Sequence, residues 1–152
     1  MSDLAAAAAL ALNGVTAGLL LGSLHAPVPR LLGMAAGPYL KAKQFLVPRY
    51  DPAMPIAIVA NVVLDCVAAA LAPHASAQVV FALAACLLLA VIAVSLVRNV
   101  PINNWEMTLD PGIAPSDWAR IDPRKLWHVW HVVRTGALTL ALAATFAAIL
   151  LG

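Results

Sequence analysis

Two short stretches of this sequence concentrate the side chains that could do chemistry. The first is "RNVPINNW" at residues 98–105, which directly follows an apolar run, and the second is "LWHVWHVVRT" at residues 126–135. Imidazole, guanidinium, amide and indole groups together can transfer protons, stabilise a negative charge and exclude water. If residues 126–135 are helical, the following share one face of the helix: Trp127, Trp130, His131 and Arg134.

The composition shows where this chemistry must take place. Hydrophobic residues make up 63% of the 152 residues and charged residues only 11%, and the mean hydropathy is +0.92. These values are typical of an integral membrane protein and exclude a soluble globular domain. The net charge of +2 is small, and the basic residues lie beside acidic ones, so a nucleic-acid partner is not expected. We expect a single membrane domain over residues 1–152, in a plasma membrane or a bacterial inner membrane.

Apolar segments long enough to cross the bilayer occur four times, which predicts an all-α, antiparallel bundle of four transmembrane helices. The helices are expected at about 4–25, 53–72, 77–97 and 126–151. The two long connections, 26–52 and 98–125, then lie on one side of the membrane and contain eight of the nine Lys and Arg residues. The positive-inside rule predicts that both connections are cytoplasmic and that both termini lie outside.

The two polar stretches therefore meet at the loop-side face of the bundle, where they can line a pocket. We expect Pro101 to end the third helix there. A stripe of small residues in the first helix (Ala7, Ala11, Gly14, Gly18 and Gly22) predicts close packing that brings His25 to the same face. The amides of Asn99 and Asn103 can bind a polar ligand, and three indoles can form apolar walls: Trp105, Trp127 and Trp130.

One ion pair is also expected inside the bundle. Asp65 is the only carboxylate within a predicted span, and an unpaired carboxylate there is costly. Arg134 lies about two turns into the last span and needs a partner facing the interior. We therefore predict that Asp65 and Arg134 form a structural polar pair.

Motifs spread along the chain resemble those of the anthrone oxygenase-like family of four-helix membrane proteins. They are "NVPIN" after the third span, "DWAR" in the second long loop and "W-x-x-W-x-x-x-R-T" at the start of the fourth span. The resemblance implies a membrane oxidoreductase, a monooxygenase that oxidises an activated methylene to a carbonyl with molecular oxygen and without an organic cofactor. It points to these positions: Asn99, Pro101, Asn103, Trp127, Trp130, Arg134 and Thr135. His131 stands where the family commonly has asparagine, which favours a different substrate or a metal.

An oxygenase of this kind needs a base, a group that stabilises an enolate, and apolar walls. His131 fits the base, Arg134 and Asn103 the stabilisers, and the substrate is a small hydrophobic phenol or carbon acid from the lipid bilayer. Two alternatives stay open. His25, His128 and His131 could instead bind copper or iron, or the groove could bind a lipid, a quinone or a partner protein without catalysis. The sequence leaves the oligomeric state undetermined, and a homo-oligomer is compatible with it.

Overall fold

The computed structural model describes residues 2–113 and 115–152, and the chain within these ranges is helical with no strand. Four long helices form the body of the molecule: α1 (Ser2–His25), α4 (Ala53–Leu71), α5 (Ala75–Val94) and α8 (Arg124–Leu150). They lie close to the four predicted spans, and each belongs to a segment long and apolar enough to cross a membrane. The predicted all-α membrane bundle is therefore confirmed.

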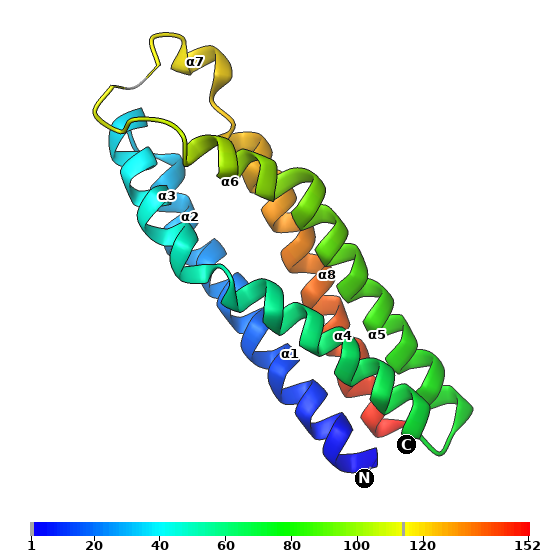
Figure 1. The fold of residues 1–152 in the computed structure, drawn as a ribbon. Helices are drawn as coiled ribbons and strands as arrows, with labels where there is room; N and C mark the ends of the chain where they lie inside the picture. Colours follow the sequence, from blue (N-terminus) through cyan, green and yellow to red (C-terminus); the bar gives the residue numbers. More distant parts are fainter. Residues whose placement is uncertain (1, 114) are drawn as a thin grey trace.

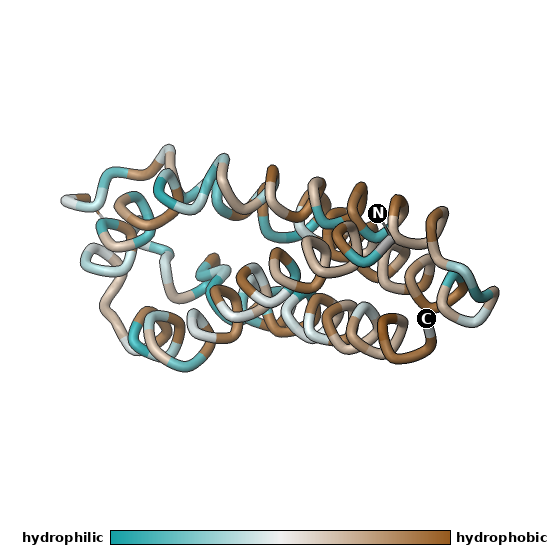
Figure 2. Tube along the Cα trace, turned by 90° about the horizontal axis from the view of Figure 1, so that it is seen from below, coloured by the Kyte–Doolittle hydropathy of each residue, from teal (hydrophilic) through white to brown (hydrophobic). Residues whose placement is uncertain are grey.

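The four long helices close into a ring in which each packs against two neighbours. The packed pairs are α1 with α4, α4 with α5, α5 with α8, and α8 with α1. Neighbouring helices run in opposite directions, so both termini and the short α4–α5 hairpin lie at one end, and both long connections at the other (Figure 1). Hydrophilic residues are more frequent toward the end with the long connections (Figure 2). Large apolar side chains such as Val63, Leu83 and Leu140 are exposed on the outside of the bundle, where lipid can cover them.

The long connections fold into short helices that cover the loop end. The first connection contains α2 (Pro27–Leu32) and α3 (Ala36–Tyr50), and the second contains α6 (Val100–Glu106) and α7 (Trp118–Ile121). α3 has fifteen residues and contains Pro48, which it tolerates because this proline lies in its last turn, where the helix continues to Tyr50. An added Cβ on Gly37 would lie 2.7 Å from the carbonyl oxygen of Pro111, so only glycine lets the two connections approach this closely.

Polar side chains fix the two connections to each other and to α8. The Gln44 side chain in α3 donates hydrogen bonds to the backbone carbonyls of Glu106 and Leu109 at 3.0 and 2.7 Å. Arg124, the first residue of α8, donates to the Met34 carbonyl at 2.6 Å and forms an ion pair with Asp122 at 2.5 Å. Unpaired carbonyls after α2 are thereby satisfied. The loop end is thus a packed part of the fold that holds its side chains in place.

The prediction that Pro101 ends the third helix was wrong. The helix continues from α5 through a π-helical segment, η1 (Ser95–Asn99), directly into α6. Proline has no N–H and its ring would clash with the carbonyl four residues earlier in a regular α-helix. In η1 the Val100 N–H instead bonds to the Ser95 carbonyl, five residues back, and this wider turn accommodates the proline. As a result, α6 carries its polar residues over the end of the bundle.

A buried polar layer crosses the middle of the bundle, but it does not contain the predicted Asp65–Arg134 pair. Asp65 accepts hydrogen bonds from the Asn13 amide at 3.1 Å and from the Thr145 hydroxyl at 3.0 Å. One turn away in α4, Asn61 donates to Thr16 at 3.0 Å. The start of α4 lies at the depth of Arg134, since Met54 lines the same cavity, so Asp65, about three turns further along α4, reaches Thr145, about 16 Å farther along α8 than Arg134. The expected ion pair was wrong for this reason.

The small-residue stripe of α1 also faces away from the position expected for it. Ala9, Asn13, Thr16, Ala17 and Leu20 form the buried face of α1. Gly18 and Gly22 are exposed, and no atom of another element lies within 4 Å of an added Cβ at either position. The packing seam predicted for the glycines was therefore wrong, and His25, which follows the stripe, is exposed as well.

Candidate functional site

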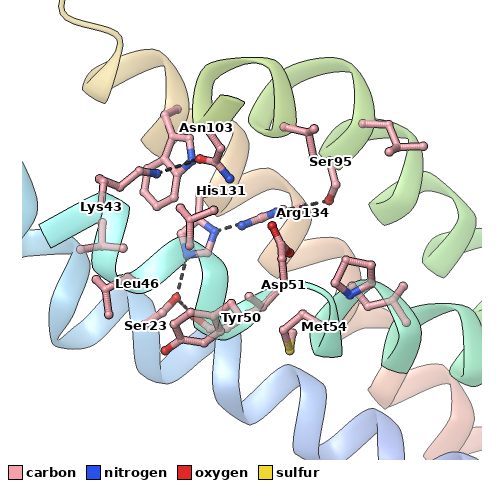
Figure 3. A pocket seen from close by; sticks show the side chains of 18 of the residues that line it. Ser23, Lys43, Leu46, Tyr50, Asp51, Met54, Ser95, Asn103, His131 and Arg134 are labelled. Atoms are coloured by element: carbon pink, nitrogen blue, oxygen red, sulfur yellow. Dashed lines mark hydrogen bonds between the residues drawn. The ribbon is translucent and has the colours of Figure 1, made fainter. Parts of the chain in front are cut away.

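A cavity of about 330 Å³ lies inside the loop end of the bundle and is lined by residues of α1, α2, α3, α5, η1, α6 and α8 and of the start of α4. This volume is at the lower end of the range typical of small-molecule sites. Most of its wall is apolar and includes Leu20, Leu46, Met54 and Ile58. Figure 3 shows the polar side chains that interrupt this wall, which come from α1, α3, η1, α6 and α8, together with Asp51 between α3 and α4.

The first polar group of the cavity centres on His131 of α8. Arg134, one turn further along the same helix, donates its Nε–H to His131 Nδ1 at 3.1 Å. The other ring nitrogen, Nε2, lies 2.7 Å from the hydroxyl oxygen of Ser23 in α1. Arg134 also donates through Nη1 to the hydroxyl of Ser95 in η1 at 3.3 Å. These contacts, drawn as dashed lines in Figure 3, link three helices across the cavity.

The hydrogen bonds determine the protonation state of His131 in this arrangement. Nδ1 accepts a hydrogen bond from the Arg134 guanidinium. A guanidinium can only donate, so Nδ1 must offer its lone pair and carries no proton. The ring is therefore neutral, with its proton on Nε2 directed to Ser23, whose hydroxyl in turn donates to the Leu20 carbonyl at 2.7 Å. Both nitrogens of His131 are engaged, and neither offers a free lone pair to the cavity.

The second polar group surrounds Lys43 of α3. Its Nζ donates to the Asn103 side-chain oxygen at 2.8 Å and forms an ion pair with Glu106 at 3.3 Å. The same Asn103 oxygen accepts the indole N–H of Trp127 at 2.9 Å. Lys43 Nζ also lies 3.8 Å from the centre of the Trp127 ring, which favours a cation. Tyr39 completes the group by donating its hydroxyl to Glu106.

The Trp127 ring joins the two polar groups. It stacks on the His131 ring with 4.9 Å between the centroids and an angle of 17°. Polar and aromatic groups thus form an unbroken arc along one wall, from Lys43 through Trp127 to His131 and Arg134, and Glu106 lies behind Lys43. Most of the remaining lining is apolar, so a bound molecule would place its polar edge against this arc.

The charges of the site are unequally compensated. Burial lowers the pKa of Lys43 to about 8, although the neighbouring Glu106 opposes this change. Burial and the Glu106 carboxylate raise the pKa of the Tyr39 hydroxyl far above its usual value, so Tyr39 acts as a hydrogen-bond donor. Arg134, in contrast, forms no ion pair within residues 2–113 and 115–152. Asp51, exposed at the rim, is the only carboxylate among the described residues that line the cavity.

The structure brings four of the residues singled out in the sequence to the cavity wall: Asn103, Trp127, His131 and Arg134. Asn99 is buried behind them and donates to the Trp127 carbonyl at 3.1 Å. Trp105 stacks on Trp118 above the bundle, and Trp130 lies under the guanidinium of Arg98. Neither of these two tryptophans lines the cavity.

The three histidines proposed as metal ligands are not brought together. Within the described ranges no group of three His, Cys, Asp or Glu side chains is arranged to hold a metal ion. His25 is exposed and its Nδ1 contacts the Leu21 carbonyl in its own helix, while His131 points into the cavity. His128 precedes His131 by three residues, and its buried Nδ1 has no hydrogen-bond partner. The predicted set of His25, His128 and His131 was wrong because α1 turns its last residue outward.

Sequence reasoning missed several polar residues of the site, among them Ser23, Lys43, Ser95 and Glu106. Lys43 lies in the first long connection between two spans, and a lysine in such a connection usually faces water. One signal was present: Glu106 is the first acidic residue after a long apolar run that contains none. A carboxylate at this depth needs a buried cation, and Lys43 is the cation that the fold supplies.

Comparison with known proteins places this site in a family context. The family model described as anthrone oxygenase matches residues 48–144 of the chain. No curated protein and no solved structure matches it. The matched range includes Asn103, Trp127, His131 and Arg134, whereas Ser23 and Lys43 precede it.

Proposed function

The chain belongs to the anthrone oxygenase family, and we propose that it is a membrane oxygenase that oxidises a hydrophobic carbon acid inside the cavity at its loop end. The observation that carries the proposal is Arg134, a cation at an apolar cavity whose hydrogen-bond partners are the neutral His131 and Ser95. Such a guanidinium is suited to stabilise a negative charge that develops on a ligand, because among the described residues no carboxylate forms an ion pair with it, and the exposed Asp51 at the rim acts on it only at longer range.

The reaction that fits this site converts an activated methylene into a carbonyl with one molecule of oxygen. Loss of a proton from the methylene gives an enolate, and an enolate can transfer an electron to O₂ without a cofactor. Recombination forms a carbon–oxygen bond, and loss of water from the resulting peroxide leaves the carbonyl. The sum is CH₂ + O₂ → C=O + H₂O, which balances without a separate reductant.

Each polar residue of the cavity has a role in this proposal. Arg134 binds the enolate oxygen, and Asn103 supplies a second polar contact at the other end of the arc. His131 orients Arg134 through Nδ1 and supports the Trp127 ring by stacking. A role of His131 as the base stays a prediction, since its Nδ1 would first have to lose the Arg134 hydrogen bond. The apolar wall excludes water, which favours both the enolate and its reaction with oxygen.

Oxygen uptake with anthrone as the probe tests the proposal. We expect the purified protein in lipid nanodiscs to consume oxygen and form anthraquinone in equal amounts. Arg134→Gln should lower kcat/KM by about 10²- to 10³-fold, the effect typical of losing an oxyanion-stabilising donor. Arg98→Gln is the matched control, because this exposed guanidinium lies over Trp130 outside the cavity.

Two outcomes contradict the proposal. One is a folded wild type that takes up no oxygen with anthrone or with other phenolic carbon acids. If that protein still quenched its tryptophan fluorescence on binding anthrone, the cavity would be a binding site without catalysis. The other is an Arg134→Gln variant that retains the wild-type rate.

A further inference from the structure

Lys43 combines burial, a cationic group and access to the cavity in a way that no other lysine of the chain does. Its exposed fraction is only 2%, whereas Lys41, two residues earlier in α3, is exposed. The side chain lines the cavity and reaches toward Asn103 (Figure 3), and its Nζ lies over the Trp127 ring. A buried lysine on an apolar cavity is costly to maintain unless it is paired. The fold provides that pairing through Glu106.

Glu106 holds Lys43 from the side away from the cavity. Its carboxylate is fully buried at the end of α6, does not line the cavity, and contacts Lys43 Nζ at 3.3 Å. The other carboxylate oxygen accepts the hydroxyl of Tyr39, which lies one turn before Lys43 in α3. Lys43 is therefore fixed at three points, by Glu106, Asn103 and the Trp127 ring, with the cavity on its remaining side. Such fixation is what a group that must meet a substrate atom needs.

We propose that Lys43 is the catalytic base of the reaction, and that Glu106 and Tyr39 are the positioning residues that hold its amine at the cavity wall. This inference rests on the proposed oxygenase function and names the group that accepts the substrate proton. It differs from the family resemblance, since Lys43 precedes the matched range of residues 48–144.

The protons balance with Lys43 as the single carrier. The neutral amine takes one methylene proton, the C–H electron pair forms the enolate, and Arg134 stabilises its oxygen. Oxygen takes one electron from the enolate and then bonds to the carbon, and the peroxide anion receives the proton back from the Lys43 ammonium. The amine next removes the second proton from the same carbon. As the C=O bond forms, the O–O bond breaks, and the departing hydroxide takes this proton and leaves as water.

The protonation behaviour of Lys43 suits this cycle. Its pKa of about 8, lowered by burial, leaves a useful fraction of neutral amine near neutral pH. Charged and titratable groups face it from each neighbouring element: Glu106 of α6, Asp51 at the end of α3, and Arg134 and His131 of α8. The two carboxylates raise the pKa and Arg134 lowers it. His131 is a weaker candidate for the base, because both of its nitrogens are occupied by Arg134 and Ser23.

The test separates a base from a buried cation. Wild-type kcat/KM for anthrone should rise with pH up to about 8, since the neutral amine is the active form. Lys43→Arg keeps a cation that does not lose its proton, so we expect a loss of about 10²- to 10⁴-fold in oxygen uptake. Lys41→Met should behave as the wild type. If Lys43 served only as a cation, Lys43→Arg would retain most of the activity and the wild-type rate would fall with increasing pH.

A double variant and its single-variant reference separate a loss of catalysis from a loss of folding. Lys43→Met alone leaves Glu106 buried and uncompensated, so Lys43→Met is combined with Glu106→Gln, and Glu106→Gln alone serves as the reference. The double variant should still bind anthrone, measured by tryptophan fluorescence, but should not catalyse exchange of the methylene protons with deuterated water in the absence of oxygen. The wild type should catalyse this exchange.

The possible failures are distinguishable. A wild type without oxygen uptake contradicts the proposed function. If the wild type is active and either Lys43→Arg or the double variant keeps the wild-type rate and pH profile, only the role of Lys43 is contradicted.

Discussion

The polar layer in the middle of the bundle predicts which residue is energetically coupled to Asp65. Asp65 accepts hydrogen bonds from Asn13 and Thr145, and Arg134 lies about 16 Å from Thr145 along α8. Hydrogen bonds between transmembrane helices contribute about 0.6 kcal/mol on average and up to about 1.7 kcal/mol. Because Asp65→Ala removes two of them, we expect the free energy of unfolding to fall by about 1–3 kcal/mol.

Two double-mutant cycles measure this coupling in mixed detergent micelles, with unfolding followed by tryptophan fluorescence. The cycle of Asp65→Ala with Thr145→Ala should give a coupling of about 0.6–1.7 kcal/mol. The cycle of Asp65→Ala with Arg134→Gln should be additive to within about 0.5 kcal/mol, as for residues that share no partner. A larger coupling of Asp65 to Arg134 than to Thr145 would refute the arrangement of α4 against α8 described here.

Two further predictions concern cofactors and topology. Because His25, His128 and His131 do not converge, we expect oxygen uptake with anthrone to survive treatment with a chelator and to persist in His128→Ala. Stoichiometric copper or iron that His128→Ala loses would argue for the metal alternative. The concentration of Lys and Arg in the two long connections predicts a cytoplasmic loop end, so a reporter that works only in the cytoplasm should be inactive when fused to the C-terminus. An active fusion would reverse the orientation.

The bundle could be predicted from the sequence because its signals are local. Four long apolar segments determine the number of helices, and the alternation of their directions places both long connections at the same end of the bundle. The spacing of residues 126–135 likewise placed Trp127, Trp130, His131 and Arg134 on one face of α8. Three of them line the cavity, whereas Trp130 lies outside it under the Arg98 guanidinium. Periodicity within one helix is thus readable without a structure.

The failures arose where depth or rotation between helices mattered. A correct prediction of the partner of Asp65 would have required the relative height of α4 and α8 in the bundle. This height depends on where the chain enters α4 after α3. The direction of the Gly18 and Gly22 face required the rotation of α1, which is set by its polar residues Asn13 and Thr16 facing inward. The helix continues through Pro101 because a π-helical segment precedes it, and no reliable sequence pattern predicts such a segment.

The family match covers only some of the residues that line the cavity. Arg134, His131 and Trp127 lie within the matched range, whereas Ser23 and Lys43 come from the part before residue 48. The match therefore covers the groups proposed to stabilise the enolate but not the group proposed to accept its proton. Lys43 becomes part of the site only because α3 packs against α6, where Glu106 pairs with the Lys43 amine beside the Trp127 ring of α8. The proposed reaction consequently depends on the packing of the first connection against the second. A change that loosens α3, such as Gly37→Ala, should therefore lower oxygen uptake although Gly37 does not line the cavity.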